Sequence, residues 1–125
     1  MKSIDLNRLR KFAQDANFAH AALMRAQDEM DNARKRIPDY ERSLQVHFDY
    51  HGEELDPKED AVSVINARAR LQADLKVGRD RLSHARAAYQ RVSAEYALAT
   101  NLARNGVEYA RRRVAIPSDI EELFQ

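Results

Sequence analysis

Gly52-Glu53-Glu54-Leu55-Asp56-Pro57 is the only helix-breaking cluster in the interior of this chain. An apolar stripe with heptad spacing lies on each side of it. The first stripe contains Leu9, Ala16, Leu23, Met30, Ile37 and Leu44, and the second contains Ala61, Arg68, Leu75, Leu82, Tyr89, Tyr96 and Ala103. Sustained heptads of this kind predict long helices that pack as in a coiled coil. We therefore expect an all-α fold, a long antiparallel two-helix hairpin with an alanine-rich seam.

The two stripes match in side-chain size when the chain folds back at this cluster. Large residues then face small ones, as in the pairs Ala33 with Leu75, Met30 with Gly78 and Ala19 with Tyr89. Closely packed helices need this matching because protein interiors tolerate neither voids nor overlap. In the same register Arg68 falls opposite Tyr40, on whose ring it can stack.

The expected boundaries follow from local signals. The hairpin occupies residues 1–116, with a first helix over about 4–51, a tip at 52–56 and a second helix over about 57–115; a short helix follows within 117–125. Asp56 at the N-cap, Pro57 at the first helical position and Glu59 two residues later predict the start of the second helix. Pro38 predicts a bend in the first helix. Ser118 and Glu121 form a second capping box, which opens a short helix over Asp119 to Phe124.

Composition limits the class of protein. The chain has 125 residues, 44% of them hydrophobic and 33% charged, and no cysteine. Disulfides and cysteine nucleophiles are thereby excluded. No apolar run approaches the length of a membrane span, and the first residues lack the apolar core of a secretory signal. We expect a cytoplasmic protein that does not enter membranes.

Charges are unevenly placed although the net charge is only +1. Acidic residues dominate the tip, which contains Asp49, Glu53, Glu54, Asp56, Glu59 and Asp60 against Lys58. The second helix is basic, and its densest patch is Arg104 with Arg111, Arg112 and Arg113. Such sorting is typical of a solvated helical surface. It also fits a protein whose acidic tip and basic shaft meet different surfaces of a partner.

The expected register leaves residues 107–125 without a hairpin partner. This overhang is apolar, with Val107, Tyr109, Ile120, Leu123 and Phe124 among its residues. Unpaired apolar side chains usually mark a contact. We expect a protein partner or a second copy to cover them, in preference to a fold-back of the short terminal helix.

No catalytic or cofactor signature is present, and the one arrangement reminiscent of a metal site is a histidine pair. His47 and His51 lie one helical turn apart near the tip, a spacing that allows two histidines to share a metal. Histidines on a helix seam usually only pack, so no metal is expected. A two-helix hairpin also offers no concave pocket with converging polar groups, which enzymes of this size need. We predict a protein that is not an enzyme.

The tip combines carboxylates with apolar side chains. Phe48, Tyr50 and Leu55 accompany Glu53 and Glu54 there, a combination that suits a binding epitope. A long two-helix finger with carboxylates at its end is similar in outline to the secondary-channel factors of bacterial RNA polymerase, which carry acidic residues into the metal site of that enzyme. The resemblance is one of architecture, and it implies a transcription regulator that enters the polymerase by its acidic tip.

Three functional hypotheses follow. The favoured one is a protein–protein interaction module, an adaptor or inhibitor that docks on a larger assembly, in a phage-encoded setting or one like the hairpin stalk proteins of bacterial secretion systems. The second is the transcription regulator. The third, less favoured, is nucleic-acid binding through the basic second helix. The candidate partner-binding residues are Phe48, Tyr50, Glu53, Glu54, Leu55, Val107, Tyr109, Arg111, Arg112, Arg113, Ile120, Leu123 and Phe124.

Overall fold

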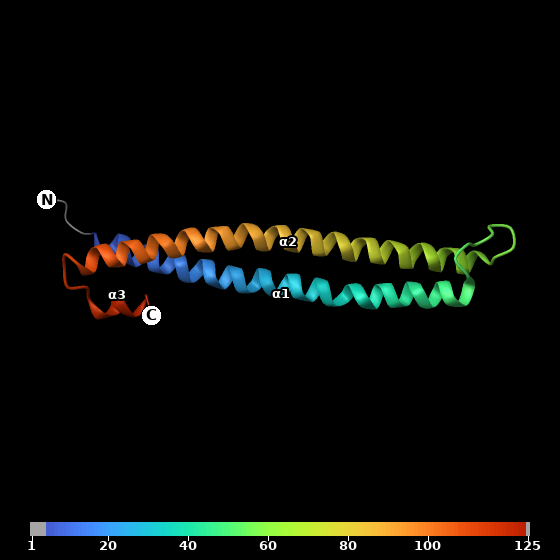
Figure 1. Cartoon of the computed structure of the whole chain (residues 1–125), viewed down its shortest axis with the longest axis horizontal. Coiled ribbons are helices and arrows are strands. Elements are labelled where there is room, and N and C mark those ends of the chain that lie inside the picture. The colour runs from blue at the N-terminus through green and yellow to red at the C-terminus, as the bar shows by residue number, and fades with distance from the viewer. Residues whose placement is uncertain (1–4, 125) are drawn as a thin grey trace. The chain divides into compact units, whose positions relative to one another are not determined.

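The structure, a computed structural model, describes residues 5–124. Its helices are α1 (Leu6–His51), α2 (Val62–Arg111) and α3 (Ser118–Glu122), with no strand in this range. The predicted all-α hairpin is confirmed: α1 and α2 run antiparallel and pack on each other (Figure 1). The chain divides into two compact units. The terminal unit comprises residues 5–27 and 88–124, and the tip unit comprises residues 28–87.

The first helix begins and continues much as predicted. Asp5 is its N-cap, because the Asp5 Oδ1 atom accepts hydrogen bonds from the backbone N–H of Asn7 at 3.0 Å and of Arg8 at 3.2 Å. Pro38 lies inside α1, which remains one helix on both sides of it. α1 ends where Gly52 adopts a φ of 84°, a left-handed conformation that favours glycine.

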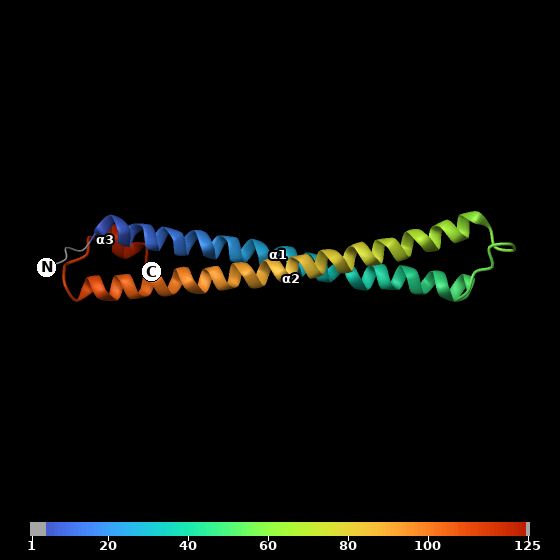
Figure 2. The ribbon, with the colours of Figure 1, turned by 90° about the horizontal axis from the view of Figure 1, so that it is seen from above.

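The tip is longer than predicted. We define it as residues 52–61, because α2 begins at Val62 and not near Pro57. Asp56 does not cap α2: its carbonyl accepts the N–H groups of Glu59 and Asp60, and Asp60 Oδ2 accepts the Asp56 N–H at 2.6 Å. The capping signal is therefore satisfied within one isolated turn, and the chain re-enters a helix only after Ala61. Figure 2 shows this loop between the two helices.

The longer tip changes which residues face each other in the tip unit. A Cβ atom on Gly78 would lie 2.8 Å from Tyr40 Cε2 and 3.5 Å from Ile37 Cδ1, so Gly78 faces Tyr40 and not Met30. Arg68 lies over the ring of Phe48, at 4.5 Å from its centroid, and not over Tyr40. Relative to the expected register, α1 is displaced by about two to three helical turns. The expectation of a close helix approach at Gly78 holds, with a different partner.

The same displacement removes the expected overhang from the terminal unit. Leu9, Val107, Ala110 and Ile120 form a buried core, and Leu6, Ile116 and Phe124 pack against it. α3 folds back beside the start of α1 and the end of α2, as Figures 1 and 2 both show. The prediction that this apolar segment awaits a partner is therefore wrong for Val107 and Ile120, whose side chains are covered by the chain itself.

Three polar contacts attach α3. Arg111 donates two hydrogen bonds to the Glu121 carboxylate, from Nε at 2.9 Å and from Nη2 at 2.6 Å. Arg10 forms an ion pair with Asp119 at 2.9 Å, and Asn17 Nδ2 donates to the Leu123 carbonyl at 3.5 Å. The N-cap of α3 is Pro117, and no side chain caps it. The predicted capping box of Ser118 with Glu121 is thus replaced by the pair of Glu121 with Arg111.

Candidate interaction surfaces

A buried arginine organises the tip. Arg68 is only 7% exposed, and its guanidinium lies on the ring of Phe48. Its Nη1 donates to the Glu53 carbonyl at 2.6 Å and its Nη2 donates to the Gly52 carbonyl. These carbonyls follow the last turn of α1, where backbone acceptors lack helical partners and a positive charge is favoured. Arg68 thus holds α2 to the segment that leaves α1.

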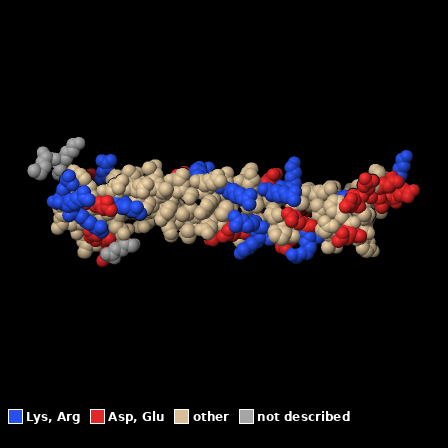
Figure 3. All heavy atoms as spheres, in the orientation of Figure 1, with Lys and Arg blue, Asp and Glu red and all other residues tan. Residues whose placement is uncertain are grey.

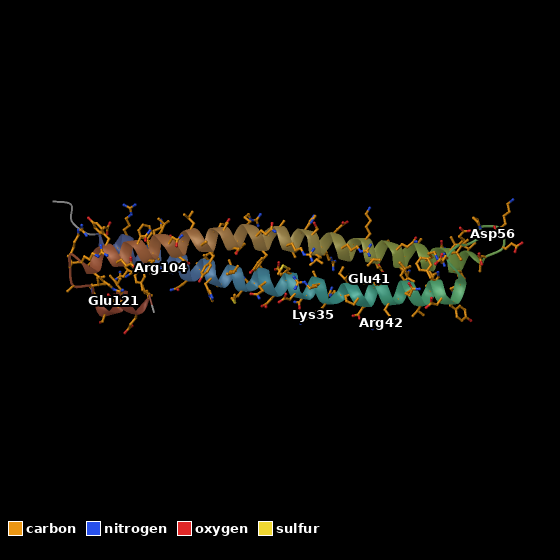
Figure 4. All side chains as sticks on the ribbon, in the orientation of Figure 1. Lys35, Glu41, Arg42, Asp56, Arg104 and Glu121 are labelled. Atoms are coloured by element: carbon orange, nitrogen blue, oxygen red, sulfur yellow. The ribbon has the colours of Figure 1, made fainter. Side chains whose placement is uncertain are left out.

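The side chains beyond this clamp differ in exposure. Tyr50 is 84% exposed and Val46, one turn earlier on α1, is 61% exposed. Phe48 and Leu55 are half-buried, so less of each is accessible than the sequence suggested. The carboxylates are at the surface: Asp49, Glu53, Glu54, Asp56 and Glu59 are all exposed. Figure 3 shows this acidic end, and Figure 4 shows Asp56 in the loop beyond the ends of both helices.

The histidine pair behaves as a packing feature. The rings of His47 and His51 lie 4.7 Å apart, and His47 is buried with no partner for Nε2 among the described residues. Burial, with the nearby His51 and Arg68, lowers the pKa of His47 below its ordinary value of 6.5. Within residues 5–124, no group of three histidine or acidic side chains is placed to hold a metal ion.

Two of the predicted basic residues have partners inside the terminal unit. The hydrogen bonds between Arg111 and Glu121 raise the pKa of Arg111 and lower that of Glu121. The Arg113 guanidinium lies 3.7 Å from the centroid of the Tyr109 ring. Arg104 and Arg112 are exposed, and no carboxylate in residues 5–124 forms an ion pair with either. Figure 4 shows Arg104 on α2 and Glu121 on α3. The predicted basic patch is thus partly used to attach α3.

A groove of about 490 Å³ lies alongside α3 in the terminal unit. Its lining comes from α1, from α2 and from the two residues that follow α3: Ala13, Ala16, Asn17, His20, Tyr96, Thr100, Ala103, Arg104, Val107, Glu108, Arg111, Leu123 and Phe124. Leu123 and Phe124 are half-buried there. The groove is therefore the part of the α1–α2 surface that α3 leaves uncovered. Residues of the chain's own C-terminal segment form one of its walls.

A second apolar feature lies on α2, and only one of its residues, Tyr109, was predicted as a binding residue. Leu98, Leu102 and Tyr109 are 63%, 47% and 49% exposed. At 100° per residue, they lie within about 40° of each other around the helix axis. Arg104, which lines the groove alongside α3, lies about 160° from Leu102 around the axis of α2. The groove and these three apolar residues are therefore on nearly opposite faces of α2. We call these three residues the α2 stripe. Their spacing of four and seven residues was the sequence signal that could have revealed it.

Comparison with protein-family models, with curated proteins and with solved structures finds no significant match for this chain. In the part of the chain from residue 5 to residue 124, no helix is both long enough and apolar enough to cross a bilayer.

Proposed function

We propose that this chain is a non-enzymatic protein-binding module, an adaptor or inhibitor that docks on a larger assembly through its tip. The observation that carries the proposal is the exposure of Tyr50, at 84%, next to a backbone clamped by the buried Arg68. Tyrosine is among the side chains most enriched at binding hot spots. A large aromatic side chain exposed to water on the last turn of α1 favours contact with another apolar surface.

The clamp favours tight binding because it restricts the tip before a partner arrives. A flexible loop loses conformational freedom on binding, and this loss weakens affinity. Arg68 reduces that loss by holding the carbonyls of Gly52 and Glu53 in place. The exposed carboxylates then define the partner's chemistry, which is a basic surface with an apolar recess for Tyr50.

Affinity capture with matched variants tests the proposal. Wild type, Tyr50→Ala and Phe18→Ala are immobilised, and proteins from the native host are captured and identified by mass spectrometry. Phe18 is the control because it is an exposed aromatic residue, 73% accessible, outside the tip unit and outside every candidate binding surface. We expect a protein set that binds wild type and Phe18→Ala, is lost with Tyr50→Ala, and dissociates as salt is raised.

The identity of the captured proteins separates the hypotheses. RNA polymerase subunits in the Tyr50-dependent set would select the transcription regulator, which uses the same tip. An identical set for wild type and Tyr50→Ala would refute docking through the tip. Nucleic-acid binding has weaker support, because Arg111 and Arg113 contact Glu121 and Tyr109.

A further inference from the structure

The α2 stripe lies on an uncovered face of the terminal unit. Leu98, Leu102 and Tyr109 are exposed, although the same stretch of α2 buries Ala103, Val107 and Ala110 on its inner face. Large apolar side chains on one helical face, with the core on another, are typical of a helix that has neighbours on two sides. α1 and α3 occupy one side only.

The exposed area of the chain is large for its mass. Its accessible surface is 9469 Å² for 14.4 kDa. A compact monomer of this mass exposes about 6,800 Å², so the surplus is roughly 2,600 Å². Interfaces of obligate dimers bury about 1,000 to 2,500 Å² on each partner. The surplus is slightly larger than the top of this range, so the exposed area of the chain is sufficient for one copy's share of a stable dimer interface.

Charges beside the stripe complement each other about a two-fold axis. Glu95 and Arg113 are separated by five full helical turns, so they lie on the same edge of the stripe, about 27 Å apart. Arg113 lies two residues past the end of α2, in a turn where the N–H groups of Arg113 and Val114 both donate to the Ala110 carbonyl at 3.0 Å, so the chain keeps an approximately helical course there. Within residues 5–124, neither Glu95 nor Arg113 belongs to an ion pair. The Arg113 guanidinium lies on the Tyr109 ring and donates to the Tyr109 carbonyl at 3.3 Å, so its charge is placed at the stripe.

We propose that a second copy of this chain docks on the α2 stripe, with the two α2 helices antiparallel about a two-fold axis level with Arg104. Glu95 of each copy then meets Arg113 of the other on the shared edge. Tyr109 comes level with the space between Leu98 and Leu102 of the other copy. Such an isologous interface closes on itself, and therefore forms a dimer and not a fibre.

Sedimentation equilibrium of the full chain measures the expected dimer. Leu102→Glu places a charge in the centre of the stripe, and we expect at least a hundredfold weaker dimerisation. Val77→Glu is the control, because Val77 is 51% exposed on the same helix but lies in the tip unit; it leaves the dimer intact. Circular dichroism verifies that each variant is helical.

A charge swap tests the two-fold arrangement itself. Glu95→Arg and Arg113→Glu, taken singly, place like charges opposite each other and weaken the dimer; the double variant restores both ion pairs and recovers the wild-type dissociation constant at least in part. A wild-type chain that is monomeric at all concentrations overturns the proposal, as does a dimer insensitive to Leu102→Glu. Growth beyond the dimer, or a double variant weaker than both single ones, overturns the two-fold arrangement. These outcomes are independent of Tyr50, so they leave the proposed function of the tip to its own test.

Discussion

Substitution of Gly78 by alanine tests the helix register most directly. Gly78 is buried, and an alanine Cβ there would lie 2.8 Å from Tyr40 Cε2 and 2.9 Å from Tyr40 Cδ2. Contacts this short do not occur in relaxed structures, so the ring or the helix must move. Overpacking of this kind costs about 1 to 3 kcal/mol, whereas alanine in place of glycine gains about 1 kcal/mol of helix propensity. We expect a net loss of about 1 kcal/mol.

Thermal and urea unfolding followed by circular dichroism provide the assay. A loss of about 1 kcal/mol lowers Tm by about 4 °C in a chain of this size. Gly106→Ala is the matched control in the same helix, because its Cβ would lie 3.2 Å from Phe12 Cδ2 and 3.4 Å from Leu9 Cδ1. These contacts need only small shifts, so the propensity gain offsets them and we expect unchanged or slightly higher stability.

A double-mutant cycle identifies the residue that Gly78 faces. In a Tyr40→Leu background the ring is gone, and Gly78→Ala should become stabilising through helix propensity. The two substitutions are therefore non-additive by at least about 1 kcal/mol. Met30→Ala serves as the comparison, since the sequence-based register placed Met30 opposite Gly78, and it should be additive. A stabilising Gly78→Ala in the wild-type background, or non-additivity with Met30 alone, would refute the register described above.

Three further predictions concern the buried and paired side chains. Ile120, 1% exposed, anchors α3; Ile120→Ala should cost about 2 to 4 kcal/mol of α3 docking and speed hydrogen exchange around Val107, with exchange in the tip unit unchanged. Arg111 lowers the pKa of Glu121 below its ordinary value of 4.5 in the folded chain. The pair therefore stabilises the fold above pH 4.5, and this stabilisation is lost as the pH falls through the lower pKa of the folded state. The Tm difference between wild type and Glu121→Gln should shrink from pH 7 to pH 3. Burial lowers the pKa of His47, so protonation favours the unfolded chain and the free energy of unfolding falls as the pH drops below 6.5. Urea unfolding should show a smaller fall in this free energy for His47→Gln than for wild type. An equal fall in the two proteins would refute this role of His47.

The sequence predicted the helices better than their alignment. The two heptad stripes correctly indicated α1 and α2, and Asp5 and Gly52 mark the ends of α1 as their residue types suggest. The start of α2 was predicted too early because Asp56-Pro57 is a strong capping signal. That signal is local, and nothing in it distinguishes an isolated turn from the first turn of a long helix. Only the hydrogen bonds between Asp56 and Asp60 decide the matter.

The errors at the C-terminal end follow from that single displacement. A tip that ends near Asp56 leaves Val107 beyond the first residues of α1. With the longer tip, Leu9 comes beside Val107 and Gly106, and the overhang disappears. α3 then finds a preformed apolar surface, so its few residues suffice to close the core. The apolar pattern of the segment was interpreted correctly, but its partner lay in the same chain.

The displacement also determines which apolar residues of α2 remain for other contacts. Val107 and Ala110 face α1 and α3, and they are buried. Leu98, Leu102 and Tyr109 lie outside the heptad seam and keep their exposure under either register, because neither position of α1 reaches that face. A single amphipathic face would suffice for a helix in an isolated hairpin. The second apolar face of α2 therefore takes no part in the packing of one copy of the chain, and it is the face that the proposed second copy would bury.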